Sequence, residues 1–250
     1  MNFVDTHCHL DLVADLEAVM ADARAAGVTR VICMGLDLGS SRSVLELARR
    51  TPGVFAGAGH HPTADSELDL AGLRQLAADP LVVAIGEVGL DFGHPDSAPA
   101  AVQVERLHAL CELALELDLP LSIHNRDAES RLLEVLGAHP GVRGVMHYWS
   151  LDWDWAERFL ALGLHLSFSG LATRSSRDAV RDVARRVPAD RLLLETDSPF
   201  GSPRGHQGKP NRPAWMVDTA RLVAELRGLS LEELEGLEAR NARAVFTRLR

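Results

Sequence analysis

Short runs of β-branched and other apolar residues alternate with longer amphipathic stretches along the whole chain. Apolar runs of about four to eight residues are typical of buried strands, and apolar positions recurring every three or four residues are typical of helices. The predicted strands are Asn2–Thr6, Thr29–Met34, Val54–Gly57, Leu81–Ile85, Pro120–Ile123, Arg143–Met146, His165–Phe168 and Arg191–Glu195. The predicted helices between them include Leu16–Ala26, Val44–Arg49, Val102–Leu117, Arg131–Gly137, Trp155–Leu162 and Arg177–Val187.

This alternation favours an α/β fold of the (β/α)8 barrel type, and an open doubly wound sheet is the alternative that the same pattern allows. The end of the chain predicts two further helices, Trp215–Arg227 and Leu231–Arg248, and Ser230 with Glu233 forms a capping-box pattern before the second. The chain shows neither a linker of Gly, Ser or Pro nor an internal repeat. We therefore expect residues 1–250 to form one domain.

Composition narrows the class of protein. The net charge of −9 argues against a broad basic face for nucleic acid, although bound divalent cations can make one cleft locally positive. The chain has neither an apolar run of about 20 residues nor a basic-then-apolar start, so we expect a cytoplasmic protein without a membrane span. Three widely spaced cysteines argue against a disulfide framework.

Metal-competent side chains follow the predicted strands. His7 and His9 follow the first strand, and residues two apart on a strand share a face. The others at strand ends are His60, His61, Glu87, His124, His147 and Asp197. In a barrel these positions converge on one rim, where the catalytic groups of this architecture sit. Such a constellation predicts a metal site.

The donor types narrow the metal. Imidazole and carboxylate together suit Zn²⁺, Mn²⁺ or Fe²⁺. Two metals in one site need a bridging anion, and Glu87 is the natural bridge because it is the sole carboxylate among the middle strand ends. Gly86 and Gly89 beside it would let the backbone pass close to ions or substrate.

Several segments together resemble the TatD family of metal-dependent deoxyribonucleases, within the amidohydrolase-like barrels. The resemblance covers essentially the whole chain and is specific because the segments occur in the family's order. They are Asp5-Thr-His-Cys-His-Leu-Asp11, Gly59-His-His-Pro62, Ile85-Gly-Glu-Val-Gly-Leu-Asp91, Leu119-Pro-Leu-Ser-Ile-His-Asn-Arg-Asp-Ala128, Val145-Met-His147, Leu166-Ser-Phe-Ser-Gly170, Leu192-Leu-Leu-Glu-Thr-Asp-Ser-Pro199, Asn211-Arg-Pro213 and Asn241…Phe246.

The resemblance implies the role of each candidate. It assigns His7, His9 and Asp197 to a first metal and His124 and His147 to a second. Glu87 would bridge the two ions, and His61 would lie near the substrate, binding phosphate or a third ion. His60 falls at a variable position and is expected to be incidental. The implied cofactors are two or three divalent ions, Zn²⁺, Mn²⁺ or Mg²⁺, and the implied activity is hydrolysis of DNA from its 3′ end.

Two segments depart from the family pattern and bear on substrate preference. His147-Tyr-Trp-Ser-Leu151 replaces a typical His-Cys-Phe-Ser-Gly, and Arg212 replaces a carboxylate. We expect Tyr148 or Trp149 to stack on a splayed base. The expected phosphate-binding cations are Arg126, Arg204, Lys209 and Arg212.

Other polar residues have supporting roles or none. Asp197 is the candidate general base, with simple ligation as its other role. Asp5 and Glu195, two residues before ligands, are expected to accept imidazole N–H bonds. Surface, packing or loop positions are expected for the remaining aromatic and histidine residues, namely Trp153, Trp155, His94, His108, His139, His165 and His206.

Three alternatives remain open at this point. An amidohydrolase acting on a cyclic amide or ester often uses a carbamylated lysine, but Lys209 is the only lysine and the fourth strand offers Glu87 instead. A D-aminoacyl-tRNA deacylase would hydrolyse an ester in the same site. A non-catalytic metal-binding partner subunit would not need an open two-metal site. We favour a monomeric hydrolase that cleaves DNA at single-stranded or exposed 3′ ends.

Overall fold

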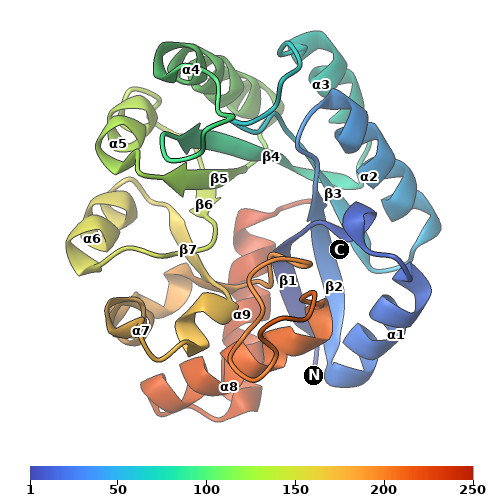
Figure 1. Cartoon of the computed structure of the whole chain (residues 1–250), viewed down its shortest axis with the longest axis vertical. Coiled ribbons are helices and arrows are strands. Elements are labelled where there is room, and N and C mark those ends of the chain that lie inside the picture. Colours follow the sequence, from blue (N-terminus) through green and yellow to red (C-terminus); the bar gives the residue numbers. More distant parts are fainter. Residues whose placement is uncertain (250) are drawn as a thin grey trace.

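A computed structural model describes residues 1–249 and shows a barrel of parallel strands surrounded by helices (Figure 1). Each strand pairs in parallel with the next strand along the chain, from the first to the eighth. The strands are β1 (Phe3–Cys8), β2 (Val28–Met34), β3 (Val54–Ala58), β4 (Val82–Asp91), β5 (Leu121–Arg126), β6 (Gly144–Met146), β7 (His165–Phe168) and β8 (Leu192–Leu194). The predicted (β/α)8 barrel is confirmed.

Helices follow the strands and form the outer layer of the barrel (Figure 1). The α-helices are α1 (Leu16–Ala26), α2 (Leu38–Arg50), α3 (Leu70–Leu76), α4 (Ala100–Leu117), α5 (Glu129–Gly137), α6 (Trp153–Ala161), α7 (Asp178–Arg186), α8 (Met216–Arg227) and α9 (Leu231–Val245). Short 3₁₀ helices lie at Leu10–Leu12, Gly170–Thr173, Ala189–Arg191 and Pro213–Trp215. Within residues 1–249, no helix has both the length and the apolar character needed to cross a membrane.

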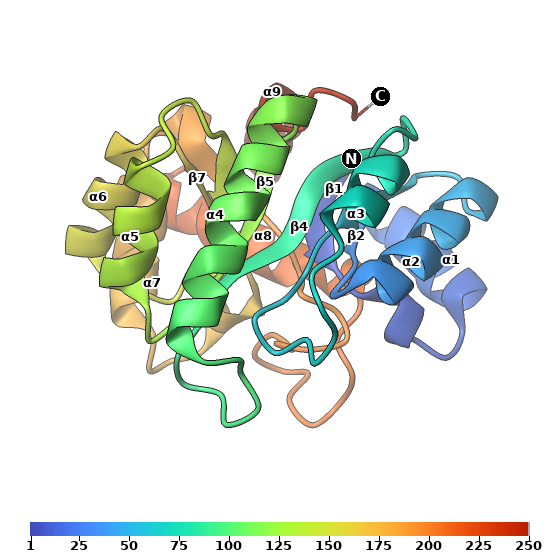
Figure 2. The ribbon, with the colours of Figure 1, turned by 90° about the horizontal axis from the view of Figure 1, so that it is seen from above.

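The strands alternate their side chains between two apolar clusters. Val31 and Cys33 of β2 pack in the layer under the helices, whereas Ile32 and Met34 belong to a second cluster inside the barrel. Phe246, just after α9, packs in that inner cluster. Helix α9 lies at the end of the barrel where the strands begin (Figure 2). The polar residues at the ends of the strands therefore lie at the opposite, open face of the barrel.

Polar side chains join β1 to β8 where the ring of strands closes. Thr6 Oγ1 donates to the Leu194 carbonyl at 2.8 Å, and Asn241 Nδ2 of α9 donates to the Leu192 carbonyl at 2.8 Å. The Val4 N–H of β1 donates to Glu238 Oε2 of α9 at 3.1 Å. Since a buried backbone group without a partner is costly, α9 stabilises the seam by supplying these partners.

The strand boundaries that differ most from the prediction are the ends of β4 and β5. β4 and β5 run on to Asp91 and Arg126, although the prediction ended them at Ile85 and Ile123. Polar residues in these extensions face the mouth of the barrel instead of the apolar core, so hydrophobicity alone stops short of the true ends. The predicted capping box of Ser230 and Glu233 is confirmed.

Long loops gather at the face where the strands end. Residues 92–99 follow β4 and residues 195–212 follow β8, and both project on the side away from the chain termini (Figure 2). The segments Pro95–Pro99 and Gly201–Pro213 were predicted to be loops at this face, which is confirmed.

Candidate metal centre

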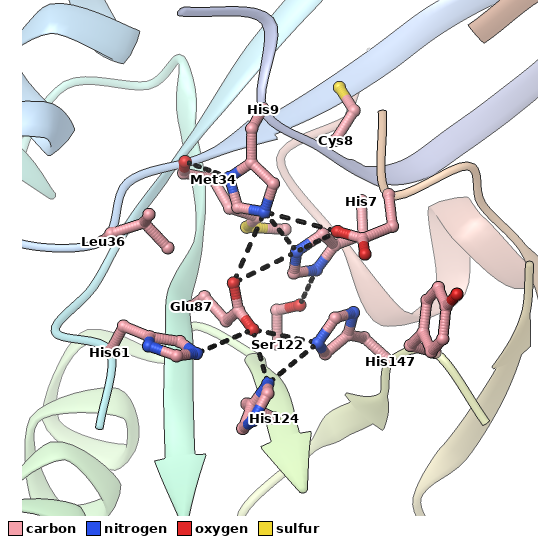
Figure 3. A network of polar contacts seen from close by, with 12 residues as sticks. His7, Cys8, His9, Met34, Leu36, His61, Glu87, Ser122, His124 and His147 are labelled. Carbon is pink, nitrogen blue, oxygen red and sulfur yellow. Dashed lines mark hydrogen bonds and ion pairs between the residues drawn. The ribbon is translucent and has the colours of Figure 1, made fainter. Parts of the chain in front are cut away.

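The predicted ligands meet at the mouth of the barrel, around the carboxylate of Glu87 (Figure 3). His7 and His9 come from the end of β1, Glu87 from β4 and His124 from β5. His147 directly follows β6, and Asp197 lies three residues beyond β8. The strand ends bring these side chains together as the sequence indicated.

One group of donor atoms lies on the Oε2 side of Glu87. The Nε2 atoms of His7 and His9 are 3.4 and 3.5 Å from Oε2 and 3.3 Å from each other. Asp197 Oδ1 lies 3.4 Å from His9 Nε2 and 3.9 Å from His7 Nε2. The donor atoms of His7, His9 and Glu87 lie within 4.8 Å of one another, and Asp197 Oδ1 approaches both imidazoles.

A second group lies on the Oε1 side of the same carboxylate. His124 Nδ1 and His147 Nε2 are each 2.9 Å from Glu87 Oε1 and 3.5 Å from each other. His61 Nε2 lies 3.4 Å from the same oxygen. The two oxygens of Glu87 therefore face two different sets of imidazoles (Figure 3).

The spacing of these donors fits divalent cations. Ligand atoms at about 2.0–2.1 Å from a tetrahedral ion are about 3.3–3.4 Å apart, and cis ligands of an octahedral ion are about 2.9 Å apart. The donor separations around Glu87 lie between 2.9 and 3.9 Å. Imidazole nitrogens and carboxylate oxygens are also the donors that Zn²⁺ and Mn²⁺ accept. The residues present therefore fit divalent metal ions.

The pKa values of the buried carboxylates and imidazoles also favour bound cations at this site. Burial would raise the pKa of Glu87, but the surrounding imidazoles, His61 and His147 first, hold it well below its usual value. Burial would lower the pKa of His9, yet Asp197 and Glu87 raise it to about 9. Similarly, Glu87 and Glu195 raise the pKa of His147 well above its usual value against the effect of burial. Without metal, the buried carboxylates favour protonation of His9 and His147, and cations would replace that positive charge.

The ligands are oriented by a second set of contacts. His7 Nδ1 lies 2.9 Å from Ser122 Oγ, and His9 Nδ1 lies 3.2 Å from the Met34 carbonyl oxygen. His147 Nδ1 lies 3.3 Å from Glu195 Oε1, as expected for Glu195. Such partners fix the tautomer and direction of an imidazole that binds metal.

Asp5 differs from its expected role. Its carboxylate accepts hydrogen bonds from the backbone N–H and the hydroxyl of Thr196, at 2.9 and 2.5 Å, and not from an imidazole. Asp5 thus reaches across the seam to Thr196, in the segment after β8. It thereby holds the chain that carries Asp197.

Asp91 is a polar partner that the sequence analysis missed. Its Oδ2 lies 3.0 Å from His124 Nε2, on the ring edge opposite the Glu87 contact. Asp91 is four residues beyond Glu87 on β4, so both face the barrel mouth. A period-2 reading continued through the polar end of the strand would have found it.

A cavity of about 780 Å³ opens above this centre. Of the residues predicted to bind substrate, His61, Arg126 and Tyr148 line it. The preceding residue His60 is buried and is not part of the lining.

The structure contradicts the prediction that Trp149 stacks on a base. Trp149 is only 2 % exposed, packs edge to face on Phe159 of α6, and donates its Nε1–H to the Leu151 carbonyl. A left-handed backbone at Tyr148, φ 50°, turns the chain after β6. As a result, Tyr148 faces the cavity and Trp149 faces the layer under the helices.

Three predicted phosphate-binding cations lie away from the cavity. Arg204 and Lys209 are exposed in the loop after β8 and are not part of the cavity lining. The Arg212 guanidinium pairs instead with Asp22 of α1 at 2.6 Å and lies over the Trp215 ring. The loop after β8, residues 195–212, is long enough to carry these side chains away from the cavity. The composition of a loop does not predict the direction in which its side chains point.

Residues missed by the sequence analysis complete the lining of the cavity. Arg174 and Arg177, from the segment between β7 and α7, line it together with Phe200 of the loop after β8. Neither their type nor their loop positions distinguished them in the sequence.

The histidines expected at surface, packing or loop positions divide into two kinds. His94, in the loop after β4, lines the cavity. His108, His139, His165 and His206 lie outside it, and His108 Nδ1 is 2.7 Å from His139 Nε2.

Gly89, beside Glu87, allows close packing of two strands. Gly89 has φ 149°, and a Cβ there would lie 2.0 Å from the His124 carbonyl oxygen. This position therefore requires glycine so that β4 and β5 can approach each other beside the candidate ligands Glu87 and His124.

Comparison with known proteins agrees with the fold and identifies the family. Residues 4–247 match the family model described as TatD related DNase. The chain is 36% identical to the uncharacterized metal-dependent hydrolase YabD of Bacillus subtilis, over 97% of this chain and 98% of that protein. It is 38% identical to the 3′-5′ ssDNA/RNA exonuclease TatD of Cronobacter sakazakii, over 93% of this chain and 92% of that protein.

Solved structures show the same relationship. The crystal structure of YJJV, a TatD homologue from Escherichia coli, superimposes with a TM-score of 0.92 at 33% identity, and 98% of each chain is covered. An uncharacterized amidohydrolase from Saccharomyces cerevisiae shares the fold, with a TM-score of 0.86 at 16% identity and coverage of 98% of this chain and 100% of that one. The family model spans nearly the whole chain, and the chain therefore belongs to the family of TatD-related DNases.

Proposed function

We propose that this protein is a two-metal phosphodiesterase that removes nucleotides from single-stranded or exposed 3′ ends of DNA. His7, His9 and Asp197 would hold one divalent ion, His124 and His147 the other, with Glu87 shared between them. The observation that carries this proposal is the position of the Glu87 carboxylate, whose two oxygens face separate donor groups at the floor of an open cavity.

When bound, two divalent cations would polarise the phosphoryl oxygens and lower the pKa of the attacking water. The protein supplies the proton acceptor: Asp197 lines the cavity, and its side chain is 15 % exposed, so a water molecule can reach it. Its Oδ1 lies 3.4 Å from His9 Nε2, which also allows the same carboxylate to act as a ligand.

The cavity is suited to an anionic substrate. Three arginines line it, Arg126, Arg174 and Arg177, and within residues 1–249 none of them has a carboxylate within ion-pair distance. Arginines elsewhere, such as Arg49 and Arg74, are paired with acidic residues. Unpaired guanidinium groups beside a metal centre favour a phosphodiester over a neutral ester.

The relatives' names support the same substrate class. The relative from Cronobacter sakazakii is named a 3′-5′ ssDNA/RNA exonuclease, while that from Bacillus subtilis is named only a metal-dependent hydrolase. A carbamylated-lysine mechanism is not available, because the only lysine, Lys209, is exposed in a loop outside the cavity. The cytoplasmic location and the monomeric state stay predictions from the sequence.

The test is release of nucleotides from 5′-labelled single-stranded and duplex DNA. Metal-stripped protein, protein resupplied with Mg²⁺, Mn²⁺ or Zn²⁺, and the Glu87→Ala variant would be compared. The matched control is Glu46→Ala, an exposed glutamate on α2 outside the cavity.

We expect metal-dependent stepwise shortening from the 3′ end, retained by Glu46→Ala and lost in Glu87→Ala. Absence of cleavage with every metal, while about two ions bind per chain, would refute the nuclease proposal. Aminoacyl-tRNA and simple ester substrates would then be tested on the same proteins.

A further inference from the structure

We infer that Phe200 is a stacking platform for the terminal nucleobase of a single-stranded substrate. The inference rests on the proposed nuclease function and specifies how that site selects its substrate. It starts from an unusual exposure: Phe200 is 53 % exposed, although it follows the buried segment that carries Asp197.

The exposed ring belongs to the cavity of the metal centre. Large apolar residues that are exposed in the described chain include Leu12, Phe92 and Leu115, but of that group Phe200 alone lines this cavity. Its ring centroid lies 6.0 Å from that of His9, edge to face, with an interplanar angle of 66°. The exposed ring of Phe200 therefore lies beside His9, one of the donors on the Oε2 side of Glu87.

The backbone of Phe200 is held in place by hydrogen bonds. Its N–H donates to the Asp197 carbonyl at 2.7 Å, and its carbonyl accepts from Asn211 Nδ2 at 2.7 Å. The same Asn211 Nδ2 donates to the Thr196 carbonyl at 2.8 Å. Asn211 thus fixes Phe200 relative to Asp197, and a platform fixed in advance loses little conformational entropy when a base stacks on it.

Tyr148, which the sequence analysis assigned to stacking, is less suited to the task. It is half-buried, and the backbone of Gly201 lies directly against its ring, since a Cβ at Gly201 would be 2.7 Å from Tyr148 Cε2. Gly201 has φ 65°, so a glycine there both permits the turn and leaves room for the ring. Tyr148 supports the segment that presents Phe200.

The charges around Phe200 are those that a nucleotide needs. Arg174 and Arg177 line the same cavity, and the buried Nε of Arg174 has no hydrogen-bond partner within residues 1–249. A nucleotide with its phosphate at the metal centre would place its base on Phe200 and leave the neighbouring phosphates to these arginines. Stacking on one ring requires a base released from its neighbour, which selects single-stranded or frayed ends without selecting sequence.

The experiment compares two oligonucleotides that differ in one base. Both are fluorescein-labelled thymidine hexamers with phosphorothioate linkages that resist cleavage, and one carries an abasic residue at its 3′ end. Dissociation constants would be measured by anisotropy on the Mn²⁺-loaded protein and on Phe200→Ala and Phe200→Trp. The control is Leu115→Ala, an exposed residue on α4 away from the cavity.

We expect Phe200→Ala to weaken binding of the base-bearing hexamer by about 5- to 160-fold, the range of one base–aromatic stack. Binding of the abasic hexamer should not change, and Phe200→Trp and Leu115→Ala should bind as the unmodified protein does. Equal binding of both hexamers by the unmodified protein, or an equal effect of Phe200→Ala on both, would overturn the inference. So would failure of the unmodified protein to bind either one.

A parallel assay separates this inference from the proposed function. The same proteins would be given an ordinary thymidine hexamer, and KM and kcat would be measured with each metal. If the unmodified protein cleaves it and Phe200→Ala has the same KM, the stacking inference fails and the nuclease proposal stands. If no protein cleaves it, the nuclease proposal fails, and the binding data alone decide whether Phe200 stacks on a base.

Discussion

Asp91 Oδ2 lies 3.0 Å from His124 Nε2, while Nδ1 of the same imidazole faces Glu87 Oε1 at 2.9 Å. The His124 ring is thus held between the carboxylate of Asp91 and the carboxylate of Glu87, the proposed shared metal ligand. The other oxygen of Asp91, Oδ1, accepts from the backbone N–H groups of Gly93 and His94 at 3.0 and 2.8 Å. Asp91 therefore couples the loop after β4 to the direction of one candidate ligand.

The Asp91→Asn variant separates these two tasks. An asparagine keeps the Oδ1 acceptor for the loop but removes the charge that faces His124. We expect metal affinity to fall by roughly 10- to 100-fold, as for other partners that orient a metal-binding histidine. Competition between the protein and a chromophoric chelator for Zn²⁺ would measure it. Asp96→Asn, on the same loop but exposed, is the control, and an unchanged affinity in Asp91→Asn would contradict the proposed role.

Arg174 offers a test of phosphate binding. Since its guanidinium lines the cavity without a carboxylate partner in the described chain, Arg174→Ala should weaken binding of single-stranded DNA. The slope of log affinity against log salt should become shallower by about 0.7, the value for one lost phosphate contact to a single strand. Binding at several NaCl concentrations would measure it, with the exposed α2 residue Arg42→Ala as control. An unchanged slope would exclude a phosphate contact at Arg174.

Trp149 should affect stability and not substrate binding. It is almost fully buried against Phe159, so Trp149→Ala should lower the free energy of unfolding by about 3–5 kcal/mol. Urea denaturation would measure the loss, and Trp149→Phe should lose less because it retains an aromatic ring. At temperatures where the variant is folded, KM for single-stranded DNA should be unchanged. A selective rise in KM would show that Trp149 does contact the substrate.

The fold and the floor of the site could be predicted from the sequence for a simple physical reason. Strands of a barrel end on one rim, so His7, Glu87 and His147 had to converge once the strands were placed. The observed bounds of helix α1 were also predicted. Its apolar positions recur with the helical period up to Ala26, and Gly27, which adopts the left-handed backbone of a helix end, follows directly.

The walls of the cavity could not be predicted in the same way. Phe200 and Arg174 lie in long loops whose direction depends on distant contacts, such as the hydrogen bond from Asn211 to the Phe200 carbonyl. Trp149 was misplaced because the left-handed backbone at Tyr148 breaks the alternation of the strand. Local patterns carry no information on these tertiary effects.

The seam between β1 and β8 leads to a prediction on pH. Glu238 is fully buried, its Oε2 accepts the Val4 N–H, and burial raises the pKa of its carboxyl well above the usual 4.5. In the folded state the carboxyl keeps its proton at pH values where the unfolded chain has lost it. Its contribution to stability is therefore complete below pH 4.5 and falls as the pH rises toward the folded-state pKa.

Glu238→Gln removes that dependence, because the amide keeps an acceptor for Val4 but never ionises. The difference in free energy of unfolding between the variant and the unmodified protein should shift in favour of the variant as the pH rises from about 5 to 8. Within the titration window the shift is at most about 1.4 kcal/mol per pH unit. Urea denaturation at several pH values would measure it, and the use of a difference cancels the titration of the metal-binding histidines.

Glu238→Ala, which leaves the Val4 N–H unpaired, should be less stable than Glu238→Gln at every pH by about 1–3 kcal/mol. Parallel pH profiles for the unmodified protein and Glu238→Gln would show that Glu238 is ionised in the fold, and the seam would then hold a buried charge.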